Sequence, residues 1–139
     1  MSGLAPQGQT EITVEGTSTV TLSGSVPISP SAPIVPINKA MIFNTAVSAN
    51  TNIFSTALSP TSAPCRFRIY ACLSASGVLS VERTSGSTTI AEQLNGGTAL
   101  TANASYLFDI VVESGQTINL QYSVAGTALE LSVDEIDLA

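Results

Sequence analysis

The sequence predicts an all-β protein: an antiparallel jelly roll or β-sandwich, preceded by an extended proline-rich N-terminal arm. First, apolar and polar residues alternate with a period of two along several short stretches, which puts every second side chain on one face of a pleated strand. Second, Gly, Asn and Ser clusters interrupt the stretches at roughly the 8–12-residue spacing of sandwich folds. Third, prolines recur every three residues near the N-terminus, which is typical of an extended polyproline II segment.

The length of 139 residues suits one domain with a core of its own. We predict that residues 1–37 form an N-terminal tail, a short β-hairpin over Glu11–Leu22 and the proline-rich arm. Residues 38–139 then form the β domain.

The arm reads SVPISPSAPIVPI over Ser25–Ile37. Proline lacks the amide donor, so this stretch cannot be a central strand, and isolated apolar side chains on a free rod would be poorly buried. Two interpretations stay open: a linker between hairpin and domain, or an arm that docks on its own domain or on a neighbouring subunit. The candidate partner-contact residues are Pro27, Ile28, Pro30, Pro33, Ile34, Val35, Pro36 and Ile37.

The middle of the chain contains further strand candidates. Ala40–Val47 is a short apolar strand, Asn52–Leu58 is a second candidate, and Ser59–Pro64 is a loop with a proline near each end. Cys65–Leu73 and Val78–Arg83 alternate cleanly on either side of a Ser- and Gly-containing turn. We therefore predict that these two form a hairpin.

Across this hairpin Arg66 and Arg68 are predicted to face Glu82. The next stretch, Thr88–Leu94, is a short strand or a turn of helix. Asn95–Gly97 then supplies residues that tolerate positive φ in a tight loop.

The clearest alternation lies in Ser105–Ile136. Three runs there are separated by turns that contain Gly115 and Gly126. We predict that they form an antiparallel meander with one buried face.

The residue types argue against an enzyme. The chain has no histidine, the commonest general base and metal ligand, and its serines lack an evident activating base. Cys65 and Cys72 lie in one stretch about 23 Å apart at strand rise, too far for a disulfide, so we expect free thiols. We expect no catalytic residue, no cofactor and no metal.

The acidic residues are interpreted as surface groups. Asp134, Glu135 and Asp137 lack the spacing of a calcium loop, and a solvated acidic tail is the prediction. Asp109 and Glu113 are predicted to be surface or interface polar groups.

The charge balance bears on partners. Four cationic and ten acidic side chains give a net charge of −6, whereas nucleic-acid binding normally needs a basic face. We expect neither nucleic acid nor membrane as a partner. Residues 1–10 show no signal-peptide pattern, so we expect synthesis in a host cytoplasm.

The segment Leu94–Ile136 resembles the C-terminal half of trimeric jelly rolls of the C1q/tumour-necrosis-factor type, and the small decoration (cement) proteins of tailed bacteriophages. The resemblance is carried by Gly96, Gly97, Tyr106, Phe108, Asp109, Gly115 and the final strand Leu129–Ile136. It covers about a third of the chain, and the first half does not match.

This resemblance implies a structural function. The chain would be a homotrimer on the surface of a virion that binds the major capsid protein and stabilises the capsid, with extended arms reaching neighbouring subunits. The alternative is a receptor- or glycan-binding fibre-tip module on the same scaffold. The absence of Trp and the scarcity of Tyr disfavour the alternative, because sugar sites favour exposed aromatic residues.

Overall fold

The computed structural model describes residues 35–137. The predicted hairpin at Glu11–Leu22 and the arm up to Ile34 lie outside the described residues, so the division at residue 37 stays a prediction. Within the described range the regular secondary structure is almost entirely β-strand, which confirms the predicted fold class. The strands are β2 (Ile37–Val47), β3 (Cys65–Leu73), β4 (Leu79–Ser85), β5 (Thr88–Gln93), β6 (Ser105–Val112), β7 (Gln116–Tyr122) and β8 (Gly126–Asp137).

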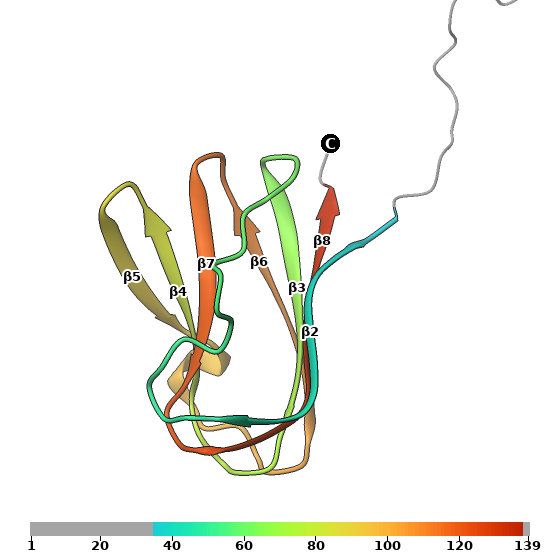
Figure 1. Cartoon of the computed structure of the whole chain (residues 1–139), viewed down its shortest axis with the longest axis vertical. Coiled ribbons are helices and arrows are strands. Elements are labelled where there is room, and N and C mark those ends of the chain that lie inside the picture. Colours follow the sequence, from blue (N-terminus) through green and yellow to red (C-terminus); the bar gives the residue numbers. More distant parts are fainter. Residues whose placement is uncertain (1–34, 138–139) are drawn as a thin grey trace, which may run out of the picture. The chain divides into compact units, whose positions relative to one another are not determined.

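The strands form two antiparallel sheets that pack as a β-sandwich (Figure 1). The first sheet has the order β2-β8-β3-β6 and the second the order β5-β4-β7. Every second residue of β3 is buried, from Cys65 to Leu73, as strand alternation requires. The side chains that fill the core include Phe67, Ile69, Leu79, Val81, Leu100, Ile118, Leu120, Tyr122, Leu131 and Val133.

The predicted meander is wrong in its pairing, although its three strands exist. β6 and β8 both lie in the first sheet, on either side of β3, whereas β7 lies in the second sheet. The turn at Gly115, whose φ is +82°, therefore carries the chain from one sheet to the other. Alternation marks a strand and its buried face, but it does not identify the neighbouring strand.

The predicted hairpin of Cys65–Leu73 with Val78–Arg83 is also wrong. β3 pairs with β6 and β8, and β4 pairs with β5 and β7. The connection between them crosses between the sheets, and a Cβ added at Gly77 would lie 2.8 Å from Cγ2 of Val124. Glu82 accordingly lies opposite Ala91 and Asn119 instead of facing an arginine.

Asn52–Leu58 is not a strand but an irregular segment that covers the edge of β7 (Figure 1). The amides of Asn50, Ile53 and Leu58 donate hydrogen bonds to carbonyls of β7 at 2.7–2.8 Å. We call residues 49–58 the covering segment.

Three smaller predictions are resolved. Thr88–Gln93 is strand β5, and Asn95, Gly96 and Gly97 have φ values of 56°, 63° and 79° in a tight left-handed turn. Cys65 and Cys72 are free thiols, as predicted.

Candidate protein-binding surface

The described end of the arm is exposed. Of the eight predicted contact residues, Val35, Pro36 and Ile37 fall within the described range, and the other five lie outside it. Val35 is 71% exposed and Ile37 is 46% exposed where β2 begins. Contact of these residues with a partner stays a prediction.

The outer face of the four-stranded sheet carries the largest set of exposed apolar groups. We define this outer face by four cross-strand rows, which follow from the register of the strands. Its two edge strands carry four large apolar side chains that are 46–57% exposed. The rows are Phe43–Glu130–Cys72–Ser105, Met41–Ser132–Tyr70–Leu107, Asn38–Asp134–Arg68–Asp109 and Ile136–Arg66–Val111. The four apolar side chains are Met41, Phe43, Leu107 and Val111.

The sequence alone did not predict this face. Met41 and Phe43 are about 65 residues away from Leu107 along the chain, and only the placement of β8 and β3 between β2 and β6 brings them to one surface. Alternation within each strand could have indicated which residues share a face, but not which strands adjoin.

Polar groups at the centre of the outer face are paired with one another. Arg68 donates from Nε and Nη2 to the carboxylate of Asp109 at 2.9 and 3.2 Å. This hydrogen bond lowers the pKa of Asp109 and raises that of Arg68. Asn38 donates to Asp134 at 2.9 Å. Asp109 is thus a surface polar group, as predicted, and a partner that covers this face would meet Arg68 and Asp109 as an ion pair that is already formed.

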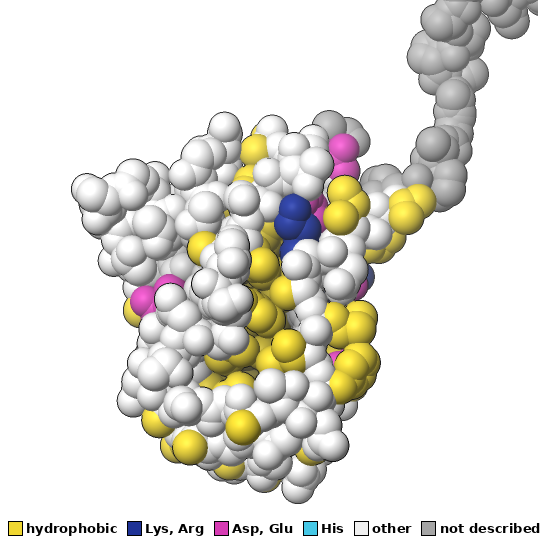
Figure 2. All heavy atoms as spheres, in the orientation of Figure 1, with side chains coloured by type: hydrophobic (Ala, Val, Ile, Leu, Met, Phe, Trp, Pro, Cys, Tyr) yellow, Lys and Arg dark blue, Asp and Glu magenta, His cyan; other side chains and the backbone are white. Residues whose placement is uncertain are grey.

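A groove of about 430 Å³ lies between β2 and the covering segment. Figure 2 shows hydrophobic atoms on the floor of this hollow. Its lining is largely apolar, with one cationic side chain: Lys39, Ala40, Met41, Ile42, Ile53, Phe54, Ser55, Thr56 and Leu58.

A buried carboxylate lies beside the N-terminal end of β2. Glu135 is 2% exposed, accepts hydrogen bonds from the amides of Thr61 and Ser62 at 2.9 Å and lies 3.2 Å from Nζ of Lys39. Burial alone would raise the pKa of Glu135, but the amide hydrogen bonds and Lys39 outweigh it and lower the pKa to about 2. The site therefore holds a carboxylate that stays charged.

The predicted solvated acidic tail is consequently wrong for Glu135. Strand β8 continues to Asp137, and Glu135 has the same parity as Leu131 and Val133, which face the core. This parity was present in the sequence and could have identified Glu135 as an inward-facing group.

Cys65 adjoins this carboxylate. Burial, followed by the negative charge of Glu135, raises the pKa of the Cys65 thiol to about 11. Because the thiolate is the nucleophilic form, this thiol is unreactive near neutral pH. Among residues 35–137 no group of His, Cys, Asp or Glu side chains could hold a metal ion.

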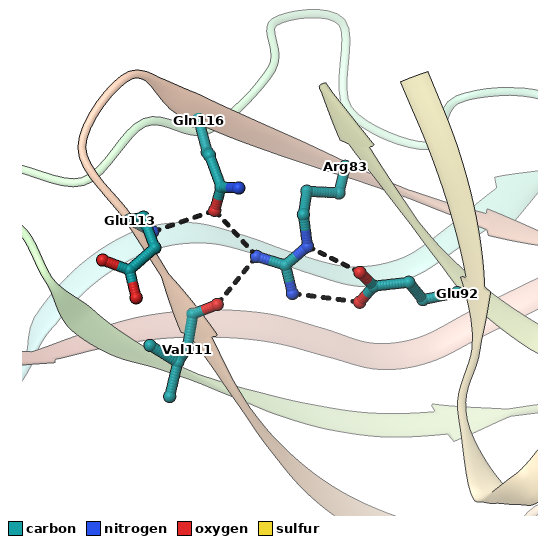
Figure 3. Close-up of polar contacts among 5 residues, drawn as sticks. All are labelled: Arg83, Glu92, Val111, Glu113 and Gln116. Atoms are coloured by element: carbon teal, nitrogen blue, oxygen red, sulfur yellow. Dashed lines mark hydrogen bonds and ion pairs between the residues drawn. The ribbon is translucent and has the colours of Figure 1, made fainter. Parts of the chain in front are cut away.

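A second polar cluster joins the two sheets near β6 (Figure 3). Arg83 of β4 donates from Nε and Nη2 to Glu92 of β5 at 2.6 and 3.0 Å. Its Nη1 donates to the carbonyl of Val111 on β6 at 2.7 Å and to Oε1 of Gln116 at 3.0 Å. The hydrogen bond from Arg83 lowers the pKa of Glu92.

The sequence did not predict this cluster, because Glu82 was expected to be the acidic partner of an arginine and the partner is in fact Glu92. The parity of Leu79, Val81 and Arg83 places all three on the inward face of β4. That pattern was readable from the sequence, whereas the carbonyl of Val111 in the other sheet was not.

No protein-family model matches the chain, and no curated protein matches it in sequence. In the part of the chain that the structure describes, no helix is long and apolar enough to cross a membrane.

Proposed function

We propose that this chain is a structural protein of a virion, which self-associates and binds the major capsid protein to decorate and stabilise the capsid. The observation that carries the proposal is the outer face, on which Met41, Phe43, Leu107 and Val111 are exposed around paired charges. Exposed apolar side chains that gather on one surface are typical of protein–protein contact sites.

The energetics set the size of such a contact. Burying apolar surface contributes about 25 cal/mol per Å², and stable interfaces bury roughly 1,200–2,000 Å² in total. The outer face and an arm that reaches a neighbouring subunit would together supply this area. The resemblance to capsid decoration proteins implies a homotrimer.

The test is attachment of the purified full-length chain to capsids of the virus that encodes it, measured by co-sedimentation and by imaging of the particles. A variant with Met41→Ser and Phe43→Ser should attach at least tenfold more weakly. Ile90→Ser is the matched control, because Ile90 is equally exposed but lies on β5 in the other sheet. Equal attachment of all three proteins would contradict a role for the outer face.

A second variant tests the arm separately. Ile28→Ser combined with Ile34→Ser removes two predicted contact residues and should also weaken attachment. Selective binding on a glycan array, with no attachment of the wild-type chain to capsids, would replace the proposal with the fibre-tip alternative.

A further inference from the structure

The edge strands of the two sheets differ in how they are protected. A free edge presents unpaired N–H and C=O groups that can pair with another chain, and proteins usually interrupt or cover such edges. Among residues 35–137 the covering segment closes the edge of β7. A register shift between Asn38 and Ala40 and a positive φ of 50° at Asn44 interrupt β2, and β5 is rich in Thr, Gln and Glu.

Strand β6 has none of these protections. Its eight residues pair with β3 without a register shift, from Val112 opposite Cys65 to Ser105 opposite Cys72. The sequence SYLFDIVV contains neither proline nor lysine. In the described part of the chain β3 is its only strand partner.

The backbone groups on the open edge can be assigned. In an antiparallel strand successive residues direct their N–H and C=O groups to opposite edges. The carbonyl of Val111 accepts a hydrogen bond from the side chain of Arg83, which indicates that it points away from β3. Leu107 and Asp109 have the same parity, so their backbone groups also point to the open edge.

We propose that β6 pairs antiparallel with β6 of a second copy of this chain, with Phe108 on the two-fold axis. The two four-stranded sheets then become one continuous sheet of eight strands. The inference rests on the proposed function for the premise that the chain self-associates, and it names the surface of the self-contact. This contact has two-fold symmetry, so it gives a dimer where the resemblance to decoration proteins implies a homotrimer.

The charge pattern of β6 selects this register. With Phe108 opposite Phe108, residues 105–111 of both copies overlap and Leu107 lies opposite Asp109 of the other copy. A shift by two residues in one direction places Asp109 opposite Asp109, and like charges in this position are destabilising. The opposite shift shortens the overlap to residues 105–109.

The inward face of β6 is also suited to the pairing. Tyr106, Phe108 and Ile110 are only partly buried in the single chain, and the rings of Tyr106 and Phe108 are parallel with centroids 6.0 Å apart. In the paired sheet Tyr106 lies opposite Ile110 of the second copy. Aromatic and β-branched cross-strand pairs of this kind stabilise sheets.

Leu107→Pro tests the backbone pairing in the full-length chain. Proline removes an amide that points to the open edge, which leaves the ladder with β3 intact. Leu107→Ala is the matched control, because it shortens the same side chain but keeps the amide. By sedimentation velocity over a concentration series, we expect the dimer of Leu107→Pro to dissociate at a concentration at least tenfold above that of Leu107→Ala.

Hydrogen exchange of the wild-type chain provides a test without substitution. We expect the amides of Leu107 and Asp109 to be protected at high protein concentration and to lose protection on dilution, whereas the Phe108 amide stays protected throughout. Circular dichroism and the urea midpoint show whether Leu107→Pro is folded. If it is unfolded, the exchange experiment on the wild-type chain is the deciding test.

Three results would overturn the inference: a wild-type chain that is monomeric at all concentrations, an oligomer such as a trimer in which the two amides exchange freely, or protection that does not depend on concentration. The last result would mean that the chain covers β6 itself. These measurements use no capsids. Attachment to capsids without β6 pairing would therefore leave the proposed function standing, and pairing without attachment would contradict the proposed function alone.

Discussion

The edges of β7 and β6 show two ways in which one chain treats a free strand. The covering segment lies along β7 and donates three backbone hydrogen bonds to its carbonyls. β6 has a comparable length and a more regular backbone, yet it receives at its open edge one described hydrogen bond, from the side chain of Arg83. Whether an edge is covered therefore depends on whether a connecting segment lies along it, and not on the residue pattern of the strand.

Buried polar side chains hold the connection between β2 and β3 in place over β7. Asn119 accepts a hydrogen bond from the amide of Phe54 at 3.0 Å and donates to its carbonyl at 2.7 Å. The side-chain amide thus replaces the strand partner that an irregular segment cannot supply. Farther along the connection, Glu135 accepts the amide hydrogen bonds of Thr61 and Ser62.

The largest expected effect comes from Asn119→Ala, which removes the side chain that holds the middle of the covering segment. The amide and the carbonyl of Phe54 both lose their partner at a buried position, and each such loss costs about 1–3 kcal/mol. We expect the free energy of unfolding to fall by about 4 kcal/mol, measured by urea denaturation.

Gln121→Ala is the control on the same strand. Gln121 also reaches the connection, through Asn52 at 2.8 Å, but at an exposed position. We expect a loss below about 1 kcal/mol. Equal losses for the two variants would show that Asn119 does not fix the segment.

Glu135→Gln tests the second attachment, and its effect depends on pH. The pKa of Glu135 falls from 4.5 to about 2 on folding, so the stabilisation is complete above pH 4.5 and is lost as the pH falls toward 2. This shift corresponds to about 3 kcal/mol. We expect the variant to be less stable by this amount at pH 7 and to approach the wild type near pH 2.

Thermal or urea unfolding at a series of pH values provides the measurement. Glu130→Gln removes a carboxylate from the outer face of the same strand and serves as the control, for which we expect the pH dependence of the wild type to persist. A Glu135→Gln chain that still loses stability between pH 4.5 and 2 to the full extent would refute the assignment.

The sequence predicted the strands but not their neighbours. Alternation identified the five strands β3, β4, β6, β7 and β8, because the residues of a buried face recur at every second position whichever strand lies beside them. The pairing depends on whether a turn reverses within a sheet or crosses between sheets. The turns at Gly77 and Gly115 were both predicted to be hairpin turns, but each joins two strands that lie in different sheets.

The candidate surface was less accessible from the sequence. Exposed residues such as Phe43 and Leu107 look like core residues in an alternating strand, since apolar character alone does not distinguish a buried face from an uncovered one. Glu135 was predictable by parity with Val133, but its partners Thr61 and Ser62 lie in a loop more than 70 residues away.

At the open edge, Arg83→Met should have a moderate effect. It removes the hydrogen bond to the carbonyl of Val111 and the ion pair with Glu92. The side chain of Arg83 is 16% exposed and that of Glu92 is 37% exposed. Loss of the guanidinium therefore leaves a partly buried carboxylate without its partner. We expect a destabilisation of about 2 kcal/mol by urea denaturation.

Arg83→Lys is the conservative control for this position. Lysine keeps the charge but cannot bind the two oxygens of Glu92 in the forked geometry and also reach Val111. We expect about half of the loss. A destabilisation by Arg83→Met below that of Gln121→Ala would mean that the β4–β6 link does not hold the sheets together.

The smallest expected effect tests the register of the proposed β6 pair. Leu107→Glu places a negative charge opposite Asp109 of the second copy, whereas Leu107→Lys places a positive charge there. Because cross-strand charge pairs contribute roughly 0.2–1 kcal/mol each and the two-fold axis forms this pair twice, Leu107→Glu should raise the dissociation constant of the dimer about two- to thirtyfold relative to Leu107→Lys. The difference should shrink in 1 M salt, where screening acts over about 3 Å. Met41→Glu and Met41→Lys, on the opposite edge of the same sheet, should show no such difference by sedimentation. If the order of the two Leu107 variants were reversed, residue 107 would lie beside a cationic residue, and because β6 contains none the proposed β6 pair would be wrong.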